Sequence, residues 1–259
     1  MTVVATPGQV AGVAFDVAGA GLPVTVFAHG LGGSSSEVRP LGTRAPGTRV
    51  LLSFRGHGES DALPGGWDYD LLATDLLTIA DHVGATCAVG LSLGAGALLR
   101  LLSAQPDRFA RLTFVLPAAL DATRSDAATA RLERLGAAID RGDAPAVTAL
   151  LLSEVPEASR VRRGAQLLVA RRAEQLLRRP APAPLRDDRP LLDRSVLSRV
   201  LAPALVVGQA GDPLHPLDLA AELADVLPDA RLLALPEGGV FWTAARQAQQ
   251  AIADHLEHA

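Results

Sequence analysis

Short apolar runs alternate with helical segments along most of the chain, and this alternation constrains the fold more than any other feature. Runs this short and this rich in β-branched residues predict buried strands, at 13–15, 24–27, 50–52, 87–89, 112–115, 204–207 and 232–234. Segments with helical spacing follow several of them, at 71–81, 95–102, 217–226 and 244–256. The order predicts an α/β fold with a mostly parallel, eight-stranded-type sheet flanked by helices. We expect the first two runs to form an antiparallel edge.

The stretch 117–195 breaks this alternation. It contains no convincing strand, and its Ala, Leu and Arg content predicts several helices that end at the proline-rich segment 180–184. We therefore expect a single domain over residues 1–259 with an inserted helical cap at 117–195. Ligands of such sheets bind beyond the carboxyl ends of the strands, where the cap would cover them.

Composition and charge exclude several classes of protein. With 259 residues, 49% of them hydrophobic, the chain can bury a core of its own. A formal charge of −4 gives no reason to expect nucleic acid or a membrane as a partner. Its single cysteine, Cys87, can form neither an intramolecular disulfide nor a cysteine-rich metal site. Because the first residues also lack the pattern of a secretory signal, we expect a cytoplasmic protein.

Arginine is concentrated in the predicted cap. Residues 160–189 hold nine Arg and three acidic residues. Such a surface could meet an anionic substrate or an acidic carrier protein at the mouth of a site. A solvated helical face is the more ordinary interpretation, because charge on exposed helices is common.

The sequence Gly90-Leu91-Ser92-Leu93-Gly94 lies between a predicted strand and a predicted helix. A serine at such a sharp turn needs strained backbone angles and very small residues two positions away on either side, as Gly90 and Gly94 provide. The turn would lift the Ser92 hydroxyl to the start of a helix, where amide donors favour developing negative charge. Ser92 is therefore the candidate nucleophile.

A second glycine-rich turn follows the predicted strand at 24–27. It reads Ala28-His29-Gly30-Leu31-Gly32-Gly33 and can present a backbone N–H group toward an oxyanion. We expect the donors of this oxyanion hole to be the N–H groups of Leu31 and Leu93, because a tetrahedral intermediate needs two. The turn-rich segment 55–61, after the next strand, is interpreted as structural.

These three segments together resemble the α/β-hydrolase superfamily, which has the His-Gly turn, an R-G-x-G-x-S-D segment and the serine turn in this order. The resemblance covers almost the whole chain and implies catalysis without a metal or an organic cofactor. It also implies a catalytic acid after a later strand. Asp212 follows the strand predicted at 204–207 and stands 120 residues after Ser92, with the cap between them.

The histidine that the resemblance implies is missing from its expected position. It should follow the last predicted strand, and the slot 28 residues after Asp212 holds Val240. Serine is a poor nucleophile unless a base takes its proton, and valine cannot do so. Possible surrogates are His215, three residues after Asp212 on the same loop, and His29, beside the proposed oxyanion turn.

Three functions fit these observations. The first is an esterase-like or thioesterase-like hydrolase of a small apolar substrate that uses Ser92 with an incomplete Ser-His-Asp triad. A lyase or cyclase could use the same pocket and oxyanion hole without a nucleophile, and a binding protein could keep the fold without turnover. The apolar substrate is suggested by the Leu- and Ala-rich cap and by Phe241 and Trp242, which core packing explains equally well.

Overall fold

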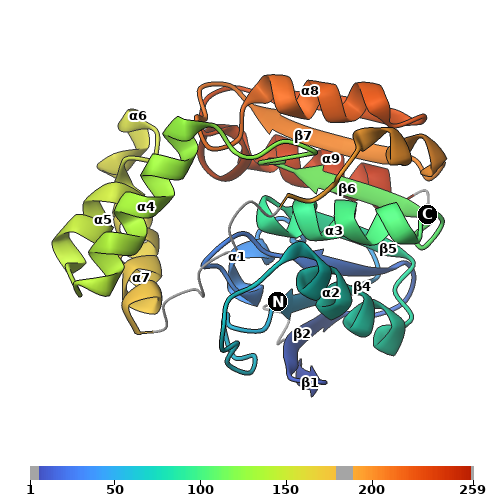
Figure 1. Cartoon of the computed structure of the whole chain (residues 1–259), viewed down its shortest axis with the longest axis horizontal. Helices are drawn as coiled ribbons and strands as arrows, with labels where there is room; N and C mark the ends of the chain where they lie inside the picture. The colour runs from blue at the N-terminus through green and yellow to red at the C-terminus, as the bar shows by residue number, and fades with distance from the viewer. Residues whose placement is uncertain (1–5, 179–188, 258–259) are drawn as a thin grey trace.

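The computed structural model describes residues 6–178 and 189–257, which form one eight-stranded sheet covered by helices on both faces (Figure 1). The strand order is β1-β2-β4-β3-β5-β6-β7-β8. The strands are β1 (Thr6–Val10), β2 (Val13–Gly19), β3 (Val24–Ala28), β4 (Thr48–Ser53), β5 (Cys87–Leu91), β6 (Arg111–Val115), β7 (Ala204–Gln209) and β8 (Ala230–Leu235). Each of the seven predicted runs lies in one of them, but the run 232–234 was predicted to be buried and in β8, an edge strand, it is mostly exposed.

The antiparallel edge differs from the expectation. β2 pairs antiparallel with both β1 and β4, whereas β3 pairs parallel with β4 and β5. The prediction that the runs at 13–15 and 24–27 pair with each other was therefore wrong. The strands that pair with β2 are β4 and β1, and β1 is an exposed edge strand with the sequence Thr-Pro-Gly-Gln-Val that has no apolar run to reveal it.

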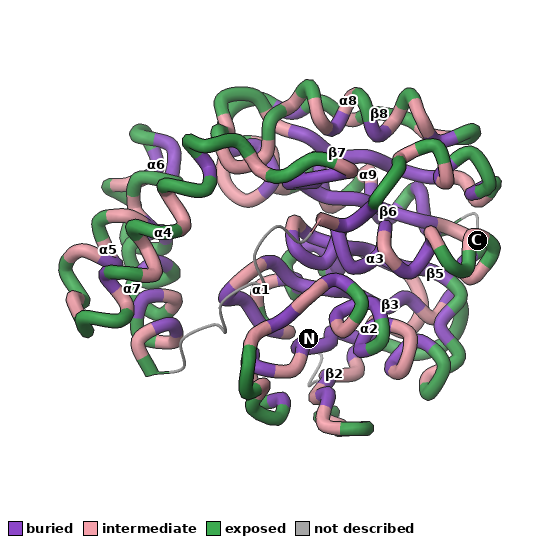
Figure 2. The backbone as a smooth tube through the Cα atoms, viewed as in Figure 1, coloured by how far each residue is buried: buried purple, intermediate pink, exposed green. Residues whose placement is uncertain are grey.

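Helices cover the two faces of the sheet and leave a buried layer on each side (Figure 2). The α-helices that the structure describes outside the stretch 117–195 are α1 (Ser35–Val38), α2 (Tyr69–Val83), α3 (Leu93–Ala104), α8 (Leu217–Val226) and α9 (Ala245–Glu257). One apolar cluster packs α2, α3 and α8 against the sheet, and a second packs α1 and α9 against the other face. Among the described residues, no helix has the length and apolar character needed to cross a membrane.

Between β6 and β7 the described residues form four α-helices of the predicted cap, namely α4 (Asp126–Asp140), α5 (Ala144–Leu152), α6 (Glu157–Arg160) and α7 (Arg163–Arg178). They stand to one side of the sheet, and α4, α5 and α7 share an apolar cluster of their own (Figure 1). No strand occurs in the described part of 117–195, and a short 3-10 helix, η1 (Arg194–Arg199), leads back to β7. The proline-rich segment 180–184 lies outside the described residues.

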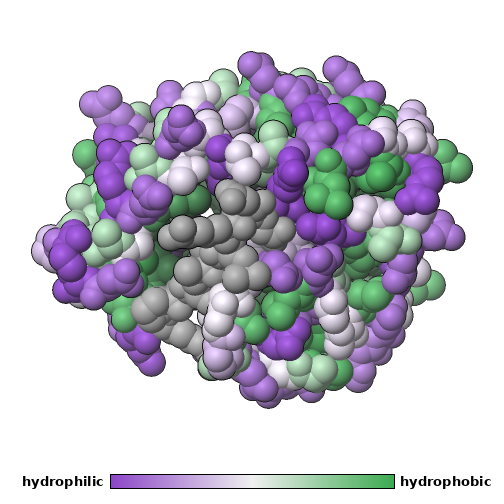
Figure 3. Space-filling model, viewed as in Figure 1, coloured by the Kyte–Doolittle hydropathy of each residue, from purple (hydrophilic) through white to green (hydrophobic). Residues whose placement is uncertain are grey.

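Hydrophilic side chains are spread over the face of the molecule shown in Figure 3, including the cap. Several arginines of 160–189 are engaged within the chain. Arg160 donates to the Val155 carbonyl at 2.8 Å, and Arg189 donates to the Asp121 carbonyl at 2.9 Å. Arg179 and Arg186 lie outside the described residues. A carrier-protein partner at this surface stays a prediction.

Candidate active site

Ser92 occupies a strained turn between β5 and α3. Its φ of 49° and ψ of −104° are unusual for a residue with a side chain, and such outliers concentrate at functional sites. The flanking glycines make the turn possible. A Cβ atom at Gly90 would lie 2.5 Å from the Gly94 carbonyl oxygen, and one at Gly94 would lie 2.5 Å from the Ala28 carbonyl oxygen.

A histidine contacts the Ser92 hydroxyl. The Nε2 atom of His215 lies 2.8 Å from Ser92 Oγ, and its Nδ1 atom lies 2.9 Å from Asp212 Oδ2. Because the Asp212 carboxylate can only accept, we assign the imidazole proton to Nδ1, which donates a hydrogen bond to the carboxylate and leaves Nε2 to accept from the serine hydroxyl. The structure thus joins Ser92, His215 and Asp212 through two hydrogen bonds, with the imidazole between the hydroxyl and the carboxylate.

The loop after β7 holds both the acid and the histidine. The Asp212 carboxylate accepts hydrogen bonds from the backbone N–H groups of Leu214 and His215, at 2.9 and 3.2 Å, which folds the loop back on itself. Pro213 and Pro216 restrict the backbone on both sides. This local turn points the imidazole at Ser92 from only three residues beyond the acid.

The electrostatics of Asp212 suit this arrangement. Burial alone would raise the pKa of its carboxyl group, but the hydrogen bond and the charge of His215, with the donors Leu214 N–H and Gln209, hold that pKa below its ordinary value. A carboxylate that stays ionised keeps the imidazole oriented and stabilises it when it takes up a proton.

Gln209, the last residue of β7, was not singled out from the sequence. Its Nε2 atom donates to Asp212 Oδ2 at 2.9 Å, and its Oε1 atom accepts from the Val240 N–H at 3.2 Å. Gln209 therefore ties the acid to the segment in which the histidine was expected. A polar amide at the end of an otherwise apolar strand is the signal that would have drawn attention to it.

Val240, the expected histidine slot, is buried. It lies in the π-helical turn η2 (Gly239–Thr243), and its side chain is 1% exposed in the apolar cluster that also contains Leu235 and Ile252. Phe241 packs against this cluster, and Trp242 packs against the apolar cluster of the cap. Both aromatic residues are thus accounted for by packing.

His29 does not contact Ser92. Its Nδ1 atom lies 2.7 Å from the Gly30 carbonyl oxygen, and its Nε2 atom accepts from the Phe54 N–H at 3.0 Å. Burial is the main cause that lowers the pKa of His29 to about 4. The hydrogen bond to the Gly30 carbonyl raises this pKa, and the charge of Arg172 lowers it by a smaller amount. The ring is neutral at pH 7 and braces the turn, so its position does not suit a base for Ser92.

The two segments expected to form the oxyanion hole meet at the serine. The Gly94 N–H donates to the His29 carbonyl at 3.0 Å, which joins the start of α3 to the turn after β3. A Cβ atom at Gly30 would lie 3.6 Å from Ser92 Cβ. Leu31 and Leu93, the next residues after Gly30 and Ser92, are therefore placed on adjoining backbone segments.

The segment 55–61 makes structural contacts. Arg55 Nε donates to the buried Asp75 carboxylate at 2.7 Å, and the Arg55 N–H donates to the same carboxylate at 3.0 Å. Ser60 accepts a hydrogen bond from the Ala14 N–H at 2.8 Å and donates to the Ser53 carbonyl at 2.5 Å. These bonds hold the turn against α2 and the edge of the sheet.

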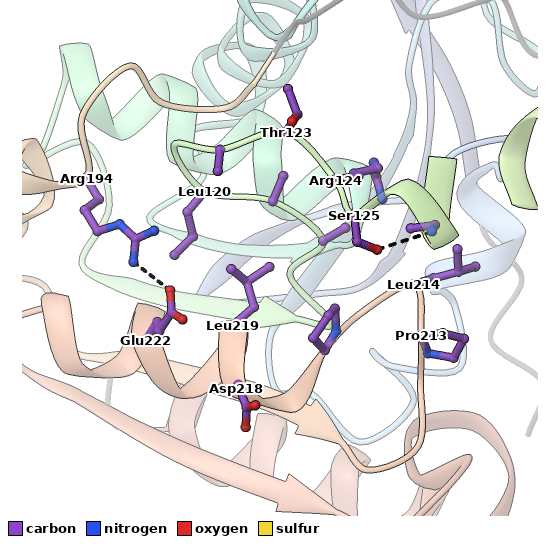
Figure 4. A pocket seen from close by; sticks show the side chains of 15 residues that line it. Leu120, Thr123, Arg124, Ser125, Arg194, Pro213, Leu214, Asp218, Leu219 and Glu222 are labelled. Carbon is purple, nitrogen blue, oxygen red and sulfur yellow. Dashed lines mark hydrogen bonds and ion pairs between the residues drawn. The ribbon is translucent and has the colours of Figure 1, made fainter. Parts of the chain in front are cut away.

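A cavity of about 240 Å³ adjoins the loop that carries His215. Figure 4 shows Pro213, Leu214 and Leu219 on one side and Leu120 on the other, with the ion pair of Arg194 and Glu222 at its edge. A second, more polar cavity of about 550 Å³ lies between α7 and the turn after β3, and its lining includes Arg171, Glu174 and Gln175.

Comparison with known proteins agrees with this architecture. Residues 25–254 match the model of the alpha/beta hydrolase family, and the chain belongs to that family. The esterase EaEST from Exiguobacterium antarcticum is 18% identical, with a TM-score of 0.76 over 95% of both chains. The naproxen esterase from Bacillus subtilis is 15% identical, with a TM-score of 0.77 over 97% of this chain and 91% of the other. Likeness at these identities establishes the fold.

One curated relative matches a shorter part of the chain. A protein described as a non-heme chloroperoxidase from Synechocystis sp. (strain ATCC 27184 / PCC 6803 / Kazusa) is 38% identical over 93 residues. The match spans 34% of this chain and 33% of the relative, so the chain covers about a third of that relative's length.

Proposed function

We propose that the chain is a serine-dependent hydrolase that cleaves an ester, thioester or similar acyl bond of a small apolar substrate. The observation that carries the proposal is the pair of hydrogen bonds that joins Ser92, His215 and Asp212. A hydroxyl bonded to an oriented imidazole is the arrangement that makes serine a nucleophile. In this proposal His215 performs the role for which position 240 was expected to supply a histidine.

The reaction follows from this geometry. His215 Nε2 takes the proton of Ser92 as Oγ attacks the carbonyl carbon, and the N–H groups of Leu31 and Leu93 stabilise the oxyanion. The protonated imidazole, paired with Asp212, then gives its proton to the leaving alcohol or thiol as the tetrahedral intermediate collapses to an acyl-enzyme. Water, deprotonated by the same imidazole, releases the acid and restores the serine.

The cavity beside the His215 loop is consistent with a small apolar substrate, although neither Ser92 nor His215 is among the residues that line it. At about 240 Å³ it is at the lower end of ligand sites and is lined largely by Ala, Leu and Pro residues. Esterases occur among the proteins of similar fold, which is consistent with acyl transfer but does not define the substrate of this chain.

The test is hydrolysis of p-nitrophenyl esters with increasing acyl length by the wild-type protein and by Ser92→Ala. Ser103→Ala, which changes a serine near the end of the helix that follows Ser92, is the matched control. We expect activity on short acyl chains that only Ser92→Ala abolishes. Activity that persists in Ser92→Ala would indicate proton-moving chemistry of the lyase or cyclase type, and no activity on any ester would favour a binding protein.

A further inference from the structure

The carboxylate of Glu37, in α1, lies inside the turn that holds the proposed oxyanion donor. Its Oε2 atom accepts a hydrogen bond from the Gly30 N–H at 2.8 Å, and the turn is closed by the Gly33 N–H, which donates to the Gly30 carbonyl at 3.0 Å. A Cβ atom at Gly33 would collide with the same carboxylate oxygen. Glu37 therefore fixes the direction of the backbone immediately before Leu31.

The cap reaches this turn through Arg172 of α7. Its Nη1 atom lies 3.1 Å from Glu37 Oε1, and its Nη2 atom donates to the Leu31 carbonyl at 3.4 Å. The Glu37 side chain is 18% exposed and the Arg172 side chain is 39% exposed, so water partly screens this ion pair. One guanidinium thus contacts both the carboxylate that holds the turn and the residue whose N–H would face the oxyanion.

Two neighbours of Arg172 extend the contact. Gln175 Nε2 donates to the Gly33 carbonyl at 3.4 Å, and Leu176 lies so close to Gly32 that a Cβ atom there would be 2.6 Å from its Cδ2 atom. The positions 172, 175 and 176 have the spacing of one helix face. That face of α7 is seated on the turn from Gly30 to Gly33.

We propose that Glu37 and Arg172 are positioning residues that couple the cap to the oxyanion hole. In this arrangement the Leu31 N–H is aimed at the carbonyl carried by Ser92 only while α7 is docked on the turn. The inference rests on the proposed function, because it gives the cap a role in the acyl-transfer step. The cap would then affect the rate of acyl transfer as well as cover the substrate.

The experiment compares Arg172→Gln, Glu37→Gln and Glu37→Ala with Arg163→Gln, which removes an exposed arginine at the start of the same helix. The first readout is hydrogen exchange of the backbone amides at 28–38, measured by mass spectrometry with no substrate. The second is the rate at which a fluorophosphonate labels Ser92, together with kcat and KM for a p-nitrophenyl ester.

We expect Arg172→Gln and Glu37→Ala to speed amide exchange in the segment 28–38. The rate of Ser92 labelling and kcat should both fall by about 10- to 100-fold, and the upper end of this range corresponds to the loss of one oxyanion donor. KM should change little. Glu37→Gln should be milder than Glu37→Ala, because its amide oxygen can still accept from the Gly30 N–H, and Arg163→Gln should behave as the wild-type protein.

The coupling would be overturned if the amides of Arg172→Gln exchanged at the wild-type rate. It would also be overturned if they exchanged faster while the rate of Ser92 labelling and kcat stayed unchanged. A lower activity that comes from KM alone would overturn it as well. Failure of the wild-type protein to label would instead refute the proposed function, and a coupling through the oxyanion hole would fall with it, whatever the exchange result.

Discussion

Replacement of Val240 by histidine tests whether the base has moved to another loop or is simply absent. Were the site only missing its histidine, Val240→His would complete it and raise esterase activity. In the structure, Ser92 Oγ and Asp212 Oδ2 are already bonded to His215. A second imidazole would find both partners engaged, so we expect kcat/KM to stay unchanged or to fall.

The same substitution should lower stability. Val240 is 1% exposed in an apolar cluster. An imidazole there would lose the packing of the valine side chain and would place polar nitrogen atoms among apolar neighbours. Burial of such a group costs about 1–3 kcal/mol, and we expect the free energy of unfolding to fall by that amount. Urea denaturation measures it, with Val240→Ala as the control for lost packing alone.

The reasoning would be refuted by a rise in kcat/KM of about tenfold or more in Val240→His, which corresponds to about 1.4 kcal/mol of transition-state stabilisation. Such a gain would mean that His215 is not the working base and that the buried segment opens to place a histidine beside Ser92. Unchanged stability would show that the cluster around Val240 is looser than the structure indicates.

Four further substitutions have defined outcomes. His215→Ala should reduce kcat by roughly 10⁴- to 10⁶-fold in ester hydrolysis, as loss of a triad member does; a tenfold loss would contradict its role. In urea denaturation, Gly94→Ala should lower the free energy of unfolding by about 1–3 kcal/mol through its clash with the neighbouring backbone. Gly136→Ala, in open space on α4, should instead raise it by about 0.5–1 kcal/mol. The hydrogen bonds of Arg194 lower the pKa of Asp121, so the stabilisation by this pair is complete above the unfolded value of about 4 and is lost as the pH falls through the lower folded value. Asp121→Asn should therefore cost stability at pH 7 and less below pH 3, as urea titrations at the two values would show.

Most of the fold could be predicted from the sequence because buried parallel strands are short and uniformly apolar. β1 was missed because its exposed residues carry no such pattern, and the partner of β2 was wrong because local sequence does not encode which strand pairs with which. Pairing at the edge depends on β4, which lies 29 residues beyond the end of β2 in the chain.

In the candidate site, the position of a residue directly after a predicted strand indicated where it would lie. The direction of its side chain could not be predicted from the sequence. Ser92 and Asp212 both follow buried strands, which is why their neighbourhood could be predicted. His215 could be named only as a possible base, because its direction depends on the turn made by the Asp212 carboxylate and two prolines. Glu37 and Gln209 act through hydrogen bonds to backbone groups, and no periodicity reveals such bonds.

The most direct test of the central claim is the mass of the intact protein after incubation with a fluorophosphonate, which reacts with activated serines. The wild-type protein, Ser92→Ala and His215→Ala are compared. We expect the wild-type protein alone to gain one adduct mass rapidly, because the proposed mechanism makes Ser92 the nucleophile and His215 its base. Labelling of His215→Ala at the wild-type rate, or no labelling of the wild-type protein, would contradict the account.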